Sequence, residues 1–511
     1  MDLPAFRNEA YSDFSVPSVR EAMETALRAV RGQFGRDYGE PFAGEKLVSR
    51  SPSRPSEIVG VHRMAAPGEA AAAVDAAFLF FPEWSRTTAE ERSRALLRAA
   101  GIIRRRKLEF DAWLVYEVGK TWVEAQAEVS EAIDFCEFYA CEALRLSSPH
   151  PMLQLPGEED ELVYLPLGVG VVIAPWNFPL AILAGMTAAA LVAGNTVVIK
   201  PSSDAPTIAA KFAEVLLEAG FPPASFHLLT GSGSALGDVL VQHPRTRFVC
   251  FTGSRDVGLH INELAARTPP GQKWIKRVIA EMGGKNAIIV DEDADLERAV
   301  EGVVASAFGY QGQKCSACSR AILDAKIYDD FLERLCAKVD TLRVGPAEDP
   351  SNYMGPVINQ KAVVSISEYI RIGGKEGRMV TGLGSIPDEG YFIRPTVFAG
   401  VAPTARLFQE EIFGPVLALT KARNFEHALE LANDSEYGLT GAVFTRNPDK
   451  MRQARERFFV GNLYLNRKCT GAMVGAHPFG GFNMSGTNSK AGGSDYLLQF
   501  LQSKSIAKKV G

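Results

Sequence analysis

Between residues 169 and 251, apolar residues occur in short continuous runs that alternate with stretches where they fall three or four positions apart. The continuous runs predict buried strands, and the spaced stretches predict helices of about 10 to 15 residues. The expected strands are 169–174, 196–200, 226–230 and 247–251, with intervening helices that end near 193, 219 and 242. This order of strands and helices predicts a doubly wound parallel sheet.

A second block with the same alternation begins after residue 281. It comprises an expected strand at 287–290, a helix at 296–308, a strand at 320–323 and a helix at 328–341. We therefore expect two α/β domains that meet near 281–285. The length of 511 residues agrees with this division, because it exceeds what one hydrophobic core usually serves.

The N-terminal part is predicted to be scaffold. We expect a helix followed by a loop within 17–46 and an antiparallel strand pair within 47–64. Thr88 and Glu91 form a capping-box pattern before a further helix, and we interpret the basic run at 104–107 as the solvated end of that helix.

Two segments outside these blocks predict contact with another subunit. Residues 147–165 carry three prolines and an acidic cluster at 158–161, so they form either a loop or an arm that reaches a second subunit. The final segment, 496–510, has poor helical periodicity, and we expect a strand or tail that adds to a neighbour's sheet. Together these segments predict a homodimer or a higher homo-oligomer.

The stretch from Leu162 to Ile199 has no charged residue and is long enough for a transmembrane helix. Prolines and glycines, however, divide it into pieces of strand or helix length, with β-branched residues at 171–173 and 197–199. Two buried parallel strands joined by an apolar helix explain this pattern better. We expect no membrane partner.

Composition narrows the class of partner. The net charge of −5 is small, and no acidic or basic tail stands out, so we expect a small-molecule substrate and no nucleic acid. Seven cysteines are an odd, sparse set that favours free thiols in a reducing compartment. Residues 1–9 resemble neither a secretory signal nor a transit peptide. We therefore expect a cytoplasmic protein.

A glycine-bearing polar loop at 309–320 carries the candidate chemistry. Its Cys315 and Cys318 are compatible with a nucleophile, a redox pair, a metal half-site or inert buried thiols. No second cysteine pair or histidine cluster completes a zinc site, so we expect no metal and a packing role for Cys318. Gly231 and Gly233 lie in a strand-to-helix turn that suits either a pyrophosphate or a plain tight turn.

Seven ordered motifs together resemble the aldehyde dehydrogenase superfamily over nearly the whole chain. They are APWNFP at 174–179, AGNTVVIKPS at 193–202, FTGS at 251–254, EMGGKN at 281–286, GQKC at 312–315, EEIFGP at 410–415 and PFGG at 478–481. The resemblance implies a Rossmann-like NAD-binding domain, an α/β catalytic domain and a small β oligomerisation arm. The implied boundaries are 1–146 and 166–283 for NAD binding, 284–470 for catalysis, 147–165 and 488–511 for the arm, and 471–487 for a substrate-anchoring loop that returns to the active site.

For catalysis, the resemblance implies that Cys315 attacks an aldehyde as its thiolate. The side-chain amide of Asn177 and the main-chain N–H of Cys315 then stabilise the oxyanion. After hydride transfer to nicotinamide, Glu281 acts as general base on the water that hydrolyses the thioester.

The resemblance also implies NAD as the cofactor. Lys200 is assigned to the adenosine ribose, Gly253 and Ser254 to the pyrophosphate, and Glu411 and Phe413 to the nicotinamide riboside. The remaining implied contacts are Ala174, Pro175, Trp176, Ser202, Ser203, Gly231, Gly233, Met282 and Gly283. Ser203 stands where many NAD-preferring members carry glutamate. Without a carboxylate to repel a 2′-phosphate, we expect NAD to be preferred and NADP to be tolerated.

The stretches 311–320, 461–467 and 470–472 narrow the resemblance to members that oxidise L-glutamate γ-semialdehyde, the open form of 1-pyrroline-5-carboxylate, in proline breakdown. This substrate carries an amino group and a carboxylate at the end remote from the aldehyde. The implied contacts are Ser316, Gly471 and Ala472 for the carboxylate with Lys314 nearby, Glu131 for the ammonium, and Phe178 and Phe479 as walls. Glu131 is equally compatible with a solvated charge or a buried ion pair, and both phenylalanines are compatible with a core role.

Other functions stay open. The chain is compatible with an NAD(P)-dependent dehydrogenase for another semialdehyde or an aliphatic aldehyde. It is also compatible with an inactive dehydrogenase-like binding or structural protein, because folds are reused for unrelated functions. We do not expect a bifunctional proline-oxidising enzyme, since 511 residues leave no room for a second catalytic domain.

Overall fold

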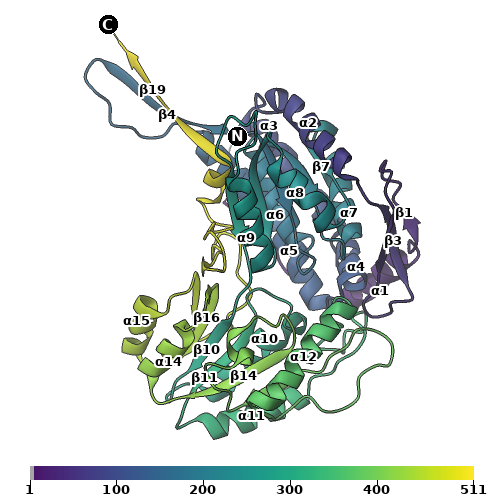
Figure 1. Cartoon of the computed structure of the whole chain (residues 1–511), viewed down its shortest axis with the longest axis vertical. Coiled ribbons are helices and arrows are strands. Elements are labelled where there is room, and N and C mark those ends of the chain that lie inside the picture. Colours follow the sequence, from purple (N-terminus) through teal and green to yellow (C-terminus); the bar gives the residue numbers. More distant parts are fainter. Residues whose placement is uncertain (1–4, 511) are drawn as a thin grey trace.

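The computed structural model describes residues 5–510 and contains two mainly parallel sheets, each covered by helices on both faces (Figure 1). The first sheet has five parallel strands in the order β7-β6-β5-β8-β9. The second has the order β12-β13-β14-β11-β10-β16-β17, in which only β12 runs antiparallel to its neighbour. The predicted doubly wound α/β fold is confirmed. Residues 1–4, on which part of the expectation about the N-terminus rests, lie outside the described residues.

The first half of the chain provides the five-stranded sheet and a small N-terminal sheet. Its elements are α1 (Pro17–Arg31), β1 (Arg36–Asp37), β2 (Lys46–Arg50), β3 (Ile58–Arg63), α2 (Pro67–Trp84), α3 (Ala89–Arg105), α4 (Lys107–Val118), α5 (Trp122–Ser147), β5 (Val169–Ile173), α6 (Ala181–Val192), β6 (Thr196–Lys200), α7 (Pro206–Glu218), β7 (Phe226–Leu228), α8 (Gly233–Gln242), β8 (Thr246–Thr252), α9 (Arg255–Ala266) and β9 (Arg277–Glu281). The uncharged stretch is therefore β5, α6 and β6, as predicted. No helix within residues 5–510 has the length and apolar character needed to cross a membrane.

The second half provides the seven-stranded sheet. Its elements are β10 (Asn286–Val290), α10 (Leu296–Phe308), β11 (Cys318–Asp324), α11 (Tyr328–Asp340), α12 (Gln360–Glu376), β12 (Arg378–Met379), β13 (Thr396–Ala399), α13 (Arg406–Gln409), β14 (Val416–Ala422), α14 (Phe425–Asn433), β15 (Tyr437–Gly438), β16 (Thr440–Phe444), α15 (Pro448–Arg457), β17 (Asn462–Leu465) and β18 (Phe482–Asn483). The chain passes from one sheet to the other between β9 and β10, where the meeting of two blocks was predicted.

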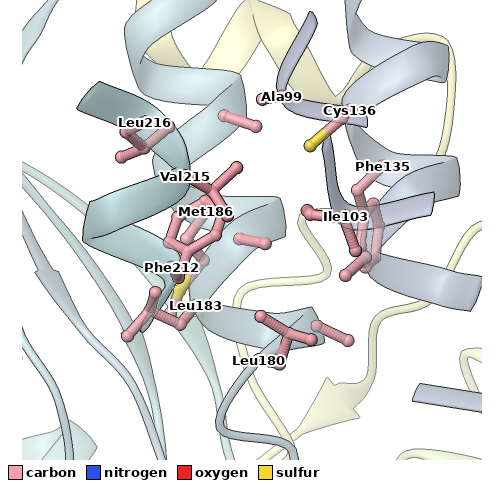
Figure 2. Close-up of a cluster of buried hydrophobic side chains, with 14 of the residues drawn as sticks. Ala99, Ile103, Phe135, Cys136, Leu180, Leu183, Met186, Phe212, Val215 and Leu216 are labelled. Atoms are coloured by element: carbon pink, nitrogen blue, oxygen red, sulfur yellow. The ribbon is translucent and has the colours of Figure 1, made fainter. Parts of the chain in front are cut away.

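Each sheet separates two apolar clusters, which explains why its strands read as continuous apolar runs. In the first sheet, Val172 packs with the helices on one face and Val171 with those on the other. Figure 2 shows part of the former cluster, where Ile103 of α3, Phe135 of α5 and Phe212 of α7 gather around α6. This cluster fixes the positions of α5 and α6, which also line the site described below.

One N-terminal expectation is confirmed and another is partly wrong. Glu91 N–H donates to Thr88 Oγ1 (3.1 Å) and Thr88 N–H donates to Glu91 Oε2 (2.8 Å), which completes the capping box. The basic run, however, does not end in solvent, because Lys107 begins α4 and is buried. Its Nζ donates to the Ala10 carbonyl (2.6 Å) and pairs with Glu9 (3.2 Å), so the N-terminal segment covers it.

A two-stranded antiparallel ribbon projects from the first half, at the top left of Figure 1. It consists of β4 (Glu158–Pro166) and β19 (Leu501–Lys509), and the 3₁₀ turn η3 (Tyr496–Phe500) precedes β19. The C-terminal strand is confirmed, and it pairs with β4 of its own chain. Its addition to a neighbour's sheet stays a prediction. Pairing within the chain satisfies one edge of each strand and leaves the outer edges for other contacts.

Candidate active site

A cavity of about 250 Å³ is bounded by α5, α6, the C-terminal ends of β8 and β9, the cysteine loop (residues 313–317) and residues 468–491. The structure brings nine of the sequence-predicted residues together on its wall. They are Glu131, Phe178, Glu281, Lys314, Cys315, Ser316, Gly471, Ala472 and Phe479. The cavity therefore joins a candidate nucleophile to the residues expected to recognise the remote end of a substrate.

The approach to the cysteine loop is strained and firmly anchored. Tyr310 and Gln311 have φ values of 47° and 56°, in the left-handed region that non-glycine residues rarely adopt. The Tyr310 hydroxyl donates to the Val118 carbonyl (3.0 Å), and Gln311 Nε2 donates to the Pro356 carbonyl (2.6 Å). Such strain persists only where surrounding contacts hold it, and it is common at active sites.

Asn286, the first residue of β10, supports the same loop from behind. Its Nδ2 donates to the carbonyls of Cys315 (2.7 Å) and Ala317 (2.9 Å), and its Oδ1 accepts from Thr440 N–H (2.9 Å). A Cβ atom on Gly284 would stand 2.5 Å from the Cys315 carbonyl, so only glycine allows this close approach. Sequence reasoning placed Asn286 in a motif but did not assign it this contact.

The two cysteines of the loop occupy different surroundings. The Cys315 side chain faces the cavity, and burial together with the Glu281 and Glu411 carboxylates raises the pKa of its thiol. Cys318 begins β11, is buried in an apolar cluster with Cys469, and donates through Sγ to the Arg320 carbonyl (3.4 Å). The resting Cys315 is thus a thiol that must lose a proton to react.

Glu281 ends β9 and lines the same cavity as Cys315. Its Oε1 accepts a hydrogen bond from the Ser489 hydroxyl (3.3 Å), and no side chain or amide within residues 5–510 bonds its buried Oε2. Burial raises the pKa of Glu281 to about 8, which suits a group that exchanges a proton near neutral pH. Asn177 is buried beside the loop, where its amide donates to the Gln313 carbonyl (3.0 Å).

Charged side chains also line the cavity. Lys314 pairs with Glu124 of α5 (2.7 Å), and Lys468 also lines the wall. Burial and the Glu128 carboxylate raise the pKa of Glu131 to about 8. Sequence reasoning missed Glu124, Asp134, Lys468 and Tyr11. The α5 residues were detectable, because the acids at 124, 131 and 134 fall on one helix face with Ala127.

The carboxyl ends of the strands in the first sheet are followed by the residues expected to bind a dinucleotide. Strand order reverses beside β5, with β6 on one side and β8 on the other, and ligands bind at such switch points. Lys200 ends β6, and its Nζ donates to the Pro201 carbonyl (2.8 Å). Ser203 Oγ donates to the Gly231 carbonyl (3.0 Å) at the turn before α8, whose N-terminal amides can approach a phosphate.

Aromatic and acidic side chains make up another group of the predicted cofactor residues. Trp176 and Phe413 meet edge to face with ring centroids 5.5 Å apart, and Phe413 has a φ of 56°. Glu411 Oε1 accepts from Gly284 N–H (2.9 Å), while a Cβ on Gly283 would overlap the Glu411 carboxylate. The remaining predicted residues follow strand ends: Ala174 and Pro175 after β5, Ser202 after β6, Gly233 at the start of α8, Gly253 and Ser254 after β8, and Met282 after β9. Met282 and Gly283 of the predicted set directly follow Glu281, which lines the cavity.

This fold, with a cysteine loop that lines a cavity and a switch point in a parallel sheet, defines an oxidoreductase of the aldehyde dehydrogenase family. The chain belongs to that family, whose profile matches residues 41–506. It is similar to the 1-pyrroline-5-carboxylate dehydrogenase of Geobacillus sp. (strain WCH70), with 54% identity over 509 residues that cover 98% of this chain and 99% of the relative.

Solved structures extend the comparison. The 1-pyrroline-5-carboxylate dehydrogenase from Thermus with bound NAD has 52% identity and a TM-score of 0.97, with 100% of both chains covered. Proline utilization A from Bdellovibrio bacteriovorus has 43% identity and the same TM-score of 0.97, but the match covers only 54% of that chain. This chain therefore corresponds to one part of the longer protein.

Proposed function

We propose that this protein is an NAD-dependent dehydrogenase that oxidises L-glutamate γ-semialdehyde to L-glutamate in proline breakdown. The observation that carries the proposal is the cavity itself, whose lining includes Cys315 and Glu281 together with the polar residues Glu131, Ser316 and Lys468. The semialdehyde has the matching arrangement, with an aldehyde at one end and opposite charges at the other.

In the proposed mechanism, the Cys315 thiolate attacks the aldehyde carbon, and the Asn177 amide and the Cys315 main-chain N–H stabilise the oxyanion. Bound NAD would supply the hydride acceptor that makes the adduct a thioester. Glu281 then takes a proton from a water molecule, and the resulting hydroxide attacks the thioester carbon. The Cys315 thiolate leaves, and L-glutamate is released.

Different residues bind the carboxylate and the ammonium group at the end of the substrate remote from the aldehyde. The Ser316 hydroxyl and the main-chain amides of Gly471 and Ala472 bind the α-carboxylate. Lys468 adds a positive charge near the α-carboxylate, whereas the positive charge of Lys314 is neutralised by its ion pair with Glu124. Glu131 binds the α-ammonium group, and Phe178 and Phe479 wall the aliphatic middle of the substrate.

In this proposal, NAD binds at the carboxyl ends of β5, β6 and β8. Lys200, Ser202 and Ser203 bind the adenosine ribose beside Gly231 and Gly233. The pyrophosphate lies against Gly253 and Ser254, and the nicotinamide riboside lies near Ala174, Pro175, Trp176, Met282, Gly283, Glu411 and Phe413. Ser203 provides no carboxylate against a 2′-phosphate, so we expect NADP to be tolerated.

The domain roles follow from these assignments. In this proposal, residues 1–146 and 166–283 bind NAD, residues 284–470 form the catalytic domain, and residues 471–487 anchor the substrate. The ribbon within 147–165 and 488–511 has free outer edges, which supports a homo-oligomer joined through the arm. Seven free cysteines support a place in the reducing cytoplasm.

A substrate panel with both cofactors tests the proposal. The kcat/KM for NADH formation should be highest with 1-pyrroline-5-carboxylate and lower with succinic semialdehyde and propanal. A far higher kcat/KM for either of the other two would transfer the assignment to another aldehyde. If no aldehyde yields NADH and Cys315 resists stoichiometric alkylation, the protein is an inactive relative.

A further inference from the structure

The loop 485–491 is bonded along the end of β9 that carries Glu281. Met282 N–H donates to the Ser485 carbonyl (2.9 Å), Thr487 N–H donates to the Ala280 carbonyl (2.8 Å), and Glu281 forms a bridge with Gly486. We propose that Ser489 and Lys490 of this loop are positioning residues that set the protonation of Glu281, and with it the pH range in which the enzyme hydrolyses its thioester.

Ser489 provides the hydrogen bond from a side chain to the Glu281 carboxylate. Its buried hydroxyl donates to Oε1 at 3.3 Å, across 208 residues of sequence. A hydrogen bond to the charged form of a carboxyl group favours that form. The other oxygen, Oε2, is buried without a partner in residues 5–510, so it is the atom free to accept a proton from water.

Lys490 provides a positive charge near the same carboxylate, and burial lowers the pKa of its amine. Its Nζ donates to the carbonyls of Gly461 (2.6 Å) and Gly480 (3.0 Å), which hold the ammonium group in place. The backbone of Lys490 has a φ of 58°, and that of Asn488 has a φ of 54°. Two left-handed non-glycine residues in one short loop indicate that its conformation is maintained against strain.

The other groups around Glu281 do not take over these roles. The charge of Glu281 raises the pKa of three other groups, which are the thiols of Cys315 and Cys250 and the hydroxyl of Tyr496. None of these groups is a cation. Burial raises the pKa of Glu281, while Ser489, Lys490 and the Gly481 amide lower it. Without Ser489 or Lys490, fewer groups would offset the effect of burial, so the pKa of Glu281 should rise.

This inference rests on the proposed function, in which Glu281 activates the hydrolytic water. A general base acts when it is deprotonated, so hydrolysis is slow below its pKa and reaches a plateau above it. Loss of the Ser489 hydroxyl or the Lys490 charge should move the midpoint of this profile to higher pH. A merely structural loss would lower the rate at every pH without moving the midpoint.

The test compares Ser489→Ala and Lys490→Met in the full-length enzyme with two matched controls. Ser225→Ala and Lys276→Met also remove buried side chains, whose hydroxyl and amine donate to the carbonyls of Pro222 and Val241 away from the cavity. Stopped-flow NADH formation with 1-pyrroline-5-carboxylate, and with propanal, follows thioester formation. Rapid quench with intact-protein mass spectrometry follows decay of the acyl-enzyme from pH 6 to pH 10.

For Lys490→Met, the midpoint should rise by about one pH unit and hydrolysis at pH 7 should slow roughly tenfold, because one pKa unit is a tenfold change in the deprotonated fraction. The rate at pH 10 should approach that of the wild type. Ser489→Ala should give a smaller rise, which Ser489→Thr restores. The controls should keep the wild-type midpoint.

An unchanged midpoint in Ser489→Ala and Lys490→Met, with rates lowered equally at all pH values, would overturn the inference. If Lys490→Met does not fold, Ser489→Ala, which deletes one oxygen atom, decides the matter. Wild-type enzyme that forms NADH from propanal but not from 1-pyrroline-5-carboxylate would contradict the proposed substrate only. The propanal acyl-enzyme would still report the midpoint.

Discussion

Replacing Asn286 with alanine should detach the cysteine loop from β10 without removing any residue proposed to contact substrate. The wild-type side chain is buried and makes three hydrogen bonds, two of them to the carbonyls of Cys315 and Ala317. At about 1 kcal/mol net for each bond, the variant should lose about 3 kcal/mol of unfolding free energy. Displacement of Cys315 by about 1 Å should lower kcat on the order of 10²-fold.

Asn195→Ala is a matched control for this change. Asn195 is also buried and makes the same number of bonds: its Oδ1 accepts from Gly168 N–H (2.9 Å), and its Nδ2 donates to the carbonyls of Ala190 (3.1 Å) and Phe500 (3.0 Å). Urea unfolding should show similar losses of stability in both variants. Only Asn286→Ala should change kcat and the rate of Cys315 alkylation by iodoacetamide. Equal kcat and alkylation rates in the two variants would refute the positioning argument.

Three further substitutions test other parts of the site. Asn177→Ala should lower kcat on the order of 10²–10³-fold by removing an oxyanion donor, and an unchanged kcat would exclude that role. Because burial raises the pKa of Glu131 to about 8, this carboxyl group is mostly neutral at pH 7 and binds ammonium better as it ionises. The KM for the substrate should therefore fall between pH 7 and pH 9 in the wild type and stay level in Glu131→Gln. Parallel KM profiles in the two proteins would contradict this role. Ser203→Glu should lower kcat/KM for NADP at least about tenfold relative to NAD, and an unaltered ratio would place the ribose elsewhere.

Most of the two-sheet fold follows from local patterns in the sequence. Strands buried on both faces are continuous apolar runs, so β5, β6, β8 and β10 could be read directly. β9 was not predicted, because Lys276 precedes it, Arg277 begins it and the run of apolar residues is short. The pairing of β19 with β4 could not be predicted either, since strand pairing across more than 300 residues depends on where the chain returns.

In the site too, sequence motifs reveal individual residues but not the contacts between residues far apart in the chain. Separate sequence motifs contain Cys315 and Glu281, and the structure shows that both residues line one cavity. The contacts that position them, from Asn286 to the Cys315 carbonyl and from Ser489 to Glu281, join residues that no periodicity connects. By contrast, the acidic face of α5 repeats every three or four residues and could have been recognised as a functional helix face.

In the proposed cycle, Cys315 carries the substrate as a thioester, and Glu281 activates the water that hydrolyses it. Mass spectrometry of Glu281→Gln mixed with 1-pyrroline-5-carboxylate and NAD tests this directly. We expect one equivalent of NADH and a stable glutamyl adduct on the peptide that contains Cys315, with no adduct in a Cys315→Ser variant. An adduct on another residue, or normal steady-state turnover without any adduct, would contradict it.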